Sequence, residues 1–237
     1  SFSIFSQDYL LKTSKDKKGN EYQYVTNDPY GTRIYTLNNG LKVYLSQNKA
    51  EPRIQTYIAV KAGSKNDPDD ATGLAHYFEH MMFKGTSKVG TLDWEKEKPL
   101  LDKIEELFEK HRKEKDPIKK KAIYEEIDKV SQEASKYVAN NEYDKLIGLI
   151  GGNGTNAFTS NDFTMYVNNI PSNELDRWLE IEDDRFTDIQ MRLFHTELET
   201  VYEEFNISQD NEYNQVFQAI FKSQLKKHPY GYKTTLG

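Results

Sequence analysis

The alternation of hydrophobic and polar positions predicts short β-strands in two parts of the chain. Five runs are rich in β-branched and aromatic residues, at residues 33–37, 41–45, 54–62, 155–159 and 164–168. Asn39-Gly40 separates the first two runs and is typical of the tight turn of a β-hairpin. Ser160-Asn161-Asp162 joins the last two runs and also consists of turn-forming residues. We therefore expect each of these two pairs of runs to form a hairpin.

Apolar positions with a helical period predict helices around these strands. The predicted helices lie at about residues 74–85, 95–138, 143–150 and 171–186, and from residue 194 onward. Within residues 95–138, Asp116-Pro117 separates two apolar stripes, and Lys and Glu fill most other positions. This pattern predicts an αα-hairpin with solvated outer faces. The hairpin could bind a partner, but a charge-coated hairpin more often has a structural role.

Strand signals alternate with long helices, and no regular βαβ repeat is present. The expected fold class is therefore α+β, a mostly antiparallel sheet packed against helices, with the hairpin at residues 95–138 projecting from it. Residues 1–30 are polar and are expected to form an N-terminal arm, whereas residues 31–237 form the main domain. Because the chain begins at Ser1 and ends without a finishing element, we expect it to be a piece of a longer protein.

Composition and charge exclude several classes of protein. The net charge is −6 and no basic stripe is present, so a nucleic acid is not an expected partner. No apolar run approaches the length of a transmembrane segment. The chain has no cysteine, which excludes disulfides and cysteine-based zinc sites but does not identify the compartment. For the location, we expect export to the periplasm or cell envelope over the cytoplasm.

One predicted helix carries candidate metal ligands, in the stretch His76-Tyr77-Phe78-Glu79-His80. At about 100° of turn per residue, the two histidines lie about 40° apart and Glu79 lies beside them. The apolar positions fall on the opposite side of the helix: Leu74, Tyr77, Phe78, Met81 and Met82. Three residues are candidates to cap the start of this helix: Asp69, Asp70 and Thr72. Two histidines and a carboxylate around Zn²⁺, with an open position for water, are typical of a hydrolytic site.

The plain alternative is a solvated helix face that carries two histidines by chance. The whole chain has only five histidines, and two of them fall within five residues around one glutamate. A buried structural histidine fits poorly, because the apolar residues lie on the opposite face. A metal site is therefore the stronger hypothesis.

The predicted helix that begins near Phe194 holds candidates for a third ligand. Glu197 and Glu204 lie seven residues apart, nearly eclipsed, on one flank of its apolar stripe, and Glu199 and Glu203 lie on the other. Periodicity alone does not choose between these two pairs. His195 is a rival ligand by its chemistry, although its place at the start of the helix favours a capping or surface role.

These motifs together resemble one known family. His76 to His80, followed by Met81-Met82-Phe83-Lys84-Gly85-Thr86, resembles the active-site helix of the pitrilysin/insulinase zinc peptidases. Glu197-Leu198-Glu199-Thr200-Val201-Tyr202-Glu203-Glu204 and Asn156-Ala157-Phe158-Thr159-Ser160 are similar to two further motifs of that family. The resemblance covers roughly residues 30–237.

The resemblance implies a function and a site. It implies a zinc-dependent metalloendopeptidase that hydrolyses peptides or unfolded segments through a zinc-activated water. One zinc ion per chain is expected on His76, His80 and Glu204, with Glu79 as the general base. Glu197 is expected to orient His76 or the set of ligands. The edge strand that docks the peptide substrate is expected at four residues: Asn156, Ala157, Phe158 and Thr159.

Two features depart from the family pattern. His80 and Glu204 are 124 residues apart, more than is usual in the family, and the hairpin at residues 95–138 accounts for the excess as an insertion. Only a metal-binding first half is present, so a second homologous half or subunit is the expected partner. The alternatives are a non-catalytic structural or chaperone-like member, inactive alone, and a purely structural zinc module. The complete ligand set and Glu79 favour the enzyme.

Overall fold

The computed structural model describes residues 9–236 and divides into two compact units, Ser1–Pro52 and Arg53–Gly237. The segment expected as an arm, residues 1–30, belongs to the smaller unit together with the first predicted hairpin. Residues 1–8 of that segment lie outside the described residues. The smaller unit is a four-stranded antiparallel sheet of β1 (Leu11–Lys15), β2 (Glu21–Val25), β3 (Arg33–Thr36) and β4 (Lys42–Leu45), in that order.

Turn chemistry explains both outer hairpins of this sheet. Gly40 has φ +87° and donates its N–H to the carbonyl of Leu37, as expected of the Asn39-Gly40 turn between β3 and β4. The turn between β1 and β2 is built on Asp16, whose carboxylate accepts the N–H groups of Lys18 and Asn20. Two strands, β1 and β2, therefore lie within the segment that was expected to be an arm.

The larger unit is built on a three-stranded antiparallel sheet. Its strands are β5 (Arg53–Val60), β6 (Asn153–Thr159) and β7 (Thr164–Pro171), in the order β5-β7-β6. Central β7 buries alternate side chains, among them Tyr166, Asn168 and Ile170. β6 is an edge strand, since β7 is its only neighbour among the described strands. The strand predicted at residues 54–62 thus forms, in a separate sheet from the first hairpin.

The described helices all belong to the larger unit. Their bounds are α1 (Leu74–Met81), α2 (Trp94–Lys113), α3 (Pro117–Ser135), α4 (Glu142–Leu149), α5 (Leu175–Thr187), α6 (Phe194–Gln209) and α7 (Glu212–Gln224). Three short 3₁₀ turns lie at Ser64–Asn66, Ser172–Glu174 and Pro229–Gly231. One core joins Tyr143 and Ile147 of α4 to Ile170 of β7 and Trp178 of α5. A second core joins Tyr77 and Met81 of α1 to Val201 of α6, so α1 and α6 pack directly against each other.

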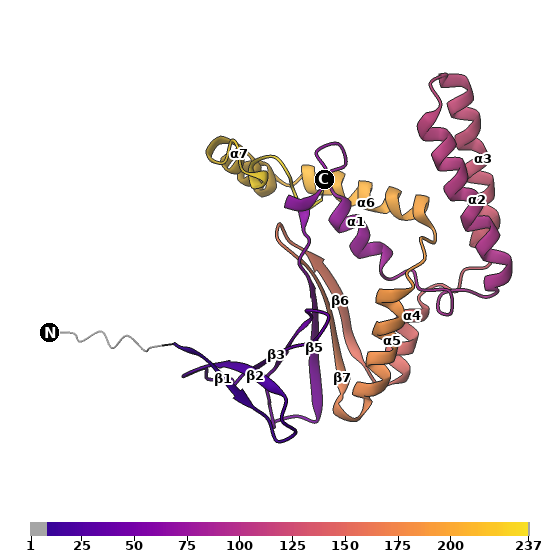
Figure 1. Ribbon diagram of the computed structural model, residues 1–237. Coiled ribbons are helices and arrows are strands. Elements are labelled where there is room, and N and C mark those ends of the chain that lie inside the picture. Colours follow the sequence, from indigo (N-terminus) through magenta and orange to yellow (C-terminus); the bar gives the residue numbers. More distant parts are fainter. Residues whose placement is uncertain (1–8, 237) are drawn as a thin grey trace. The chain divides into compact units, whose positions relative to one another are not determined.

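Helices α2 and α3 form the predicted antiparallel hairpin and extend away from the sheet (Figure 1). The carboxylate of Asp116 accepts the N–H groups of Ile118 and Lys119 and so caps α3, which begins at Pro117. Leu107 of α2 and Ile127 and Ala134 of α3 are buried between the helices. Asp116-Pro117 therefore ends the first helix and starts the second, as its sequence predicts.

The prediction of the α+β class is confirmed, with antiparallel pairing in every described ladder. The strands form two sheets, where the sequence suggested one. Helix α7 was not predicted. No helix in residues 9–236 combines the length and apolar character needed to cross a membrane.

Candidate metal centre

Helix α1 is started by a carboxylate that lies outside the helix. The N-cap is Gly73, with φ +81° and no side-chain cap, so the prediction of a cap at Asp69, Asp70 or Thr72 is wrong. The Asp67 carboxylate instead accepts the N–H groups of Gly73 and Ala75, each at 2.9 Å. Lys233 donates to the Asp67 carbonyl and pairs with Asp69 at 2.9 Å. This loop therefore fixes the start of the helix that carries the histidines.

Three candidate ligands converge between α1 and α6. Nε2 of His76 lies 3.2 Å from Nε2 of His80, and Oε2 of Glu204 lies 3.4 Å and 3.5 Å from these two atoms. His76, His80 and Glu204 can each direct one ligand atom to a common point, with the three atoms within 4.8 Å of one another. Because Val201 packs against Tyr77 and Met81, the packing of the two helices sets the register of Glu204 on α6.

The other candidates for the third ligand lie elsewhere. Glu199 and Glu203 are exposed on α6, on the flank away from this point. His195 packs between Phe108 of α2 and Tyr124 of α3, with ring centroids 5.0 Å away in each case. The structure therefore brings Glu197 and Glu204, and not the rival pair, to the histidines of α1.

The spacing of the three ligand atoms fits zinc. In a tetrahedral site with zinc–ligand bonds of about 2.0–2.1 Å, neighbouring ligand atoms lie about 3.3 Å apart. The distances of 3.2–3.5 Å among His76, His80 and Glu204 agree with this spacing. Two imidazole nitrogens and one carboxylate oxygen are also the donor types that zinc accepts in hydrolytic sites. The residues present therefore fit a single zinc ion.

Glu197 orients His80 through the ring nitrogen that faces away from the candidate metal position. Nδ1 of His80 donates to Oε1 of Glu197 at 2.8 Å, which leaves Nε2 to face the candidate metal position. Lys84, in the loop after α1, pairs with the other oxygen of Glu197. Nδ1 of His76, by contrast, is buried without a hydrogen-bond partner among the described residues.

These contacts set the ionisation of the buried groups. Burial opposes ionisation of Glu197, but the hydrogen bonds from His80 and Lys84 outweigh it and hold the pKa of that carboxyl below its usual range. The hydrogen bond to Glu197 raises the pKa of His80. Burial, together with the nearby His80, lowers the pKa of His76. The low pKa of His76 keeps it neutral at neutral pH, the state that binds a metal ion.

Glu79 is a residue of α1, and its side chain reaches the edge strand β6. Its side chain is only 8% exposed, and the hydroxyl of Thr159 donates to its Oε2 at 2.6 Å. Burial raises the pKa of Glu79, although the Thr159 hydrogen bond opposes this rise. Of the predicted docking strand, Thr159 thus contacts Glu79, Asn156 and Ala157 line a cavity beside it, and Phe158 is exposed against Phe163.

A buried arginine that the sequence did not reveal holds the loop after α1. Arg192 lies between α5 and α6, is 0% exposed, and donates Nε to Glu97 of α2 at 2.6 Å. Its Nη atoms donate to the carbonyls of Lys84, Thr86 and Val89 at 2.6–3.1 Å. One guanidinium therefore joins the helical hairpin to the loop that carries Lys84. Periodicity could not reveal a contact between residues 95 positions apart.

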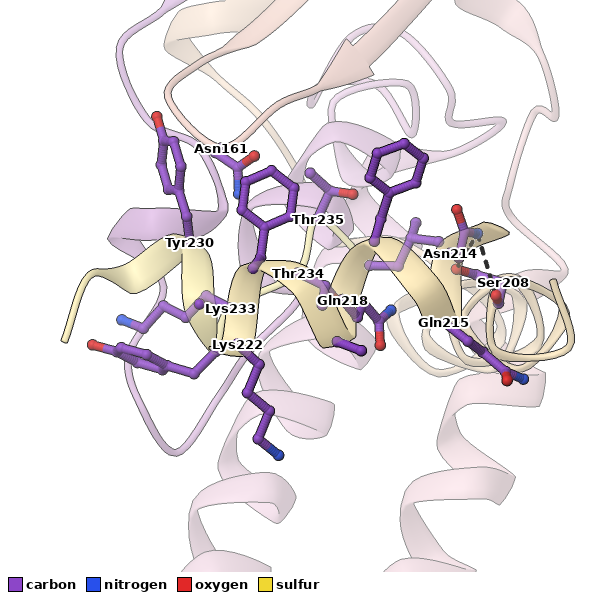
Figure 2. A pocket seen from close by; sticks show the side chains of 16 residues that line it. Asn161, Ser208, Asn214, Gln215, Gln218, Lys222, Tyr230, Lys233, Thr234 and Thr235 are labelled. Atoms are coloured by element: carbon purple, nitrogen blue, oxygen red, sulfur yellow. Dashed lines mark hydrogen bonds between the residues drawn. The ribbon is translucent and has the colours of Figure 1, made fainter. Parts of the chain in front are cut away.

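One cavity adjoins this centre, and a second lies beyond the other end of β6. One of about 340 Å³ is lined by Glu79, His80, the start of α4 and part of β6. Another, of about 580 Å³, lies between α7 and residues 230–236, with Asn161 of the β6–β7 turn in its wall (Figure 2).

The sequence and fold are similar to those of known proteases. The model of the family Insulinase (Peptidase family M16) matches residues 42–101 and 127–235. An uncharacterized zinc protease, YmxG, of Bacillus subtilis (strain 168) is 22% identical over 200 residues, which are 84% of this chain and 37% of that protein.

Two solved structures share the fold. A protease from Helicobacter pylori has a TM-score of 0.60 and 22% identity, over 87% of this chain and 38% of that one. The first half of the periplasmic protease PqqL from Escherichia coli has a TM-score of 0.59 and 17% identity, over 87% of this chain and 35% of that one. The chain thus spans little more than a third of each of these proteins.

Proposed function

Because the chain belongs to the insulinase family of peptidases, family M16, we propose that it carries the metal centre of a zinc-dependent endopeptidase. The observation that supports this most strongly is the convergence of His76, His80 and Glu204 beside a buried carboxylate that is not itself a ligand. A purely structural zinc site has four protein ligands, whereas this centre offers three and leaves a position open.

His76, His80 and Glu204 would hold one zinc ion per chain. When bound there, zinc supplies a Lewis acid that polarises the peptide carbonyl and lowers the pKa of water. Glu197 keeps His80 in the tautomer that presents Nε2, and Lys84 keeps Glu197 ionised. These two residues act through His80 and are positioning residues.

Glu79 is the proposed general base. It would accept a proton from the attacking water and deliver it to the amine that leaves, so its pKa must lie nearer to neutrality than that of an ordinary glutamate. Burial raises the pKa of Glu79 in this direction. The hydrogen bond from Thr159 fixes one oxygen and leaves the other, Oε1, for the proton transfer.

The free edge of β6 is the proposed docking site for the substrate backbone. In an antiparallel ladder, the main-chain groups of alternate residues point to opposite sides. The N–H of Ser160 donates toward β7, so the N–H groups of Thr159 and Ala157 point to the free edge. An extended peptide can add there through main-chain hydrogen bonds, which suits a peptidase that accepts varied unfolded segments.

We also propose a second homologous half or subunit and a location outside the cytoplasm. The basis for the first is that the chain spans little more than a third of each protein it resembles. The basis for the second is the name of one solved structure that shares the fold, the periplasmic protease PqqL from Escherichia coli. Cell fractionation and co-purification test these two points.

The experiment that tests the function compares Glu79→Gln with the unchanged protein, in the presence of its second half. Glutamine keeps the size of the side chain but cannot accept the proton, so bound zinc should remain while peptide hydrolysis falls about a hundredfold or more. Zinc is measured by elemental analysis and hydrolysis with a quenched peptide. A Glu79→Gln protein that keeps its zinc and cleaves at the normal rate would contradict the proposal. An unchanged protein that binds zinc and cleaves nothing would favour the non-catalytic alternative.

A further inference from the structure

The cavity of about 340 Å³ is continuous with the proposed reaction centre. One side is formed by the end of α1 and the loop after it, another by residues 139–144 at the start of α4, and the third by residues 155–157 of β6. Glu79 and His80 form part of its wall. A peptide that lies along β6 and reaches Glu79 must therefore pass the mouth of this cavity.

The lining is strongly acidic. Its carboxylates are Glu79, Glu142, Asp144 and Glu197, and Lys84 is its only lysine or arginine. Lys84 is already paired with Glu197. Neither Glu142 nor Asp144 has an ion-pair partner among the described residues, although Glu142 accepts the N–H of Gly90 with one oxygen. Two negative charges in the wall are therefore not compensated by a cation.

The strand geometry places the cavity relative to the scissile bond. Thr159 contacts Glu79, whereas the cavity adjoins residues 155–157, which lie two to four residues earlier in β6. At about 3.3 Å per residue this is a separation of roughly 7–13 Å along the strand. A peptide that pairs antiparallel to β6, as β7 does on the other side, runs from Thr159 toward Thr155. The cavity then receives a side chain on the C-terminal side of the scissile bond.

The cavity at the other end of β6 has a different character. Asn161, in the turn after β6, lies in its wall with the residues of α7 and the segment after it (Figure 2). No carboxylate is among its described lining residues, which include Lys222 and Lys233. Of these two cavities, only the one that adjoins Glu79 and His80 has uncompensated carboxylates in its wall.

We propose that the cavity of about 340 Å³ is a subsite that selects a lysine or arginine side chain, about two to four residues on the C-terminal side of the scissile bond. This proposal rests on the proposed peptidase function. The volume suits a long side chain, and Glu142 and Asp144 provide acceptors for an ammonium or guanidinium group. An acidic side chain at the same position meets two like charges and is rejected.

The test uses end-blocked peptides of one neutral sequence in which a single position is Lys, Gln or Glu. Affinities are measured by fluorescence anisotropy with the Glu79→Gln protein, which does not consume the peptide. For at least one position we expect the Lys peptide to bind about tenfold more tightly than the Gln peptide, a difference of about 1.4 kcal/mol. The double variant Glu142→Gln/Asp144→Asn should reduce this ratio to about twofold or less. Its glutamine still accepts the N–H of Gly90, so the loop is kept.

The matched control is Asp176→Asn/Glu180→Gln, which removes two exposed carboxylates from α5, outside the cavity. It should keep the full preference for Lys. Equal affinity for the Lys and Gln peptides at every position would overturn the proposal, and so would a preference that survives in the cavity variant. Mass spectrometry of the fragments from the active protein then locates Lys relative to the cleaved bond. Consistent cleavage on the C-terminal side of Lys would contradict the placement.

The binding comparison tests the subsite and the hydrolysis assay tests the peptidase function, so each proposal can be contradicted without the other. A preference for Lys that depends on Glu142 and Asp144, in a protein that cleaves no peptide, supports the subsite and contradicts the peptidase function. Cleavage without any preference supports the peptidase function and contradicts the subsite.

Discussion

Lys84 is the residue that links the loop after α1 to the candidate metal centre. Its ammonium pairs with Glu197, and Glu197 in turn accepts the Nδ1–H of His80. Partners of this kind orient a ligand and raise its basicity, and their loss typically lowers metal affinity 10–100-fold. Position 84 is adjacent to a recognisable motif, but nothing in the spacing of residues indicates that its side chain turns back toward α6.

For Lys84→Met we expect zinc to bind about tenfold more weakly, because Glu197 loses the cation that holds its second oxygen. A competition titration with a coloured chelator measures this affinity. Lys88→Met is the control, since Lys88 lies in the same loop but pairs with Asp184. Equal zinc affinity in the two variants would contradict the role given to Lys84.

At the scale of the elements, a buried ion pair helps to connect the helical hairpin α2–α3 to the loop after α1. Arg192 and Glu97 are both 0% exposed, and Arg192 also holds three carbonyls of the loop after α1. The hairpin therefore supports the loop that carries Lys84. Its two helices were readable from apolar stripes and from Asp116-Pro117, whereas its attachment was not, because it depends on residues far apart in sequence.

Arg192→Met should destabilise the protein by about 3–5 kcal/mol, since it leaves the Glu97 carboxylate buried without a counter-charge. Urea unfolding measures this loss. The double variant Arg192→Met/Glu97→Gln should recover part of it, because no buried charge remains. Lys98→Met breaks the exposed pair with Asp102 and should cost less than about 1 kcal/mol. An Arg192→Met protein as stable as the Lys98→Met protein would show that the buried pair does not hold the hairpin.

Strand β6 permits a prediction about substrate docking. The N–H of Ala157 points to the free edge, so Ala157→Pro removes a donor offered to the peptide and leaves the bonds to β7 in place. Peptide affinity of the Glu79→Gln protein should fall at least severalfold, while the temperature of unfolding changes little. Thr155→Ser is the control on the same strand. If Ala157→Pro binds peptides normally, docking along this edge is wrong.

At the scale of the whole molecule, the sequence predicted elements that depend on local patterns better than it predicted contacts between distant residues. The hairpin at Asn39-Gly40, the helical hairpin and the histidine helix follow from turn residues and periodicity, and each lies where it was predicted. The pairing of β5 with β7 joins residues more than 100 positions apart and could not be read locally. Strand β1 was missed because its sequence, LKTSK, is mostly polar. Strand β2, EYQYV, does alternate polar and apolar residues, but it is short and lies in a polar segment that was assigned to an arm.

The candidate site, too, was predictable where it depends on local periodicity and not where it depends on packing between distant helices. Helical periodicity brought His76, Glu79 and His80 to one face but left two carboxylate pairs open on α6. The packing of Val201 against Tyr77 and Met81, a tertiary contact, sets which pair faces α1. Asp67, Lys84 and Arg192 support the site through backbone groups and distant partners, so no motif marks them.

The most direct test of the account is the zinc content of two neighbouring variants, Glu204→Gln and Glu203→Gln. The two side chains are adjacent in sequence, but Glu204 approaches both histidines and Glu203 is exposed. We expect Glu203→Gln to retain one zinc ion per chain and Glu204→Gln to lose most of it under the same dialysis, because one of three ligands is removed. A Glu204→Gln protein with full zinc content, or a loss confined to Glu203→Gln, would contradict the metal centre described here.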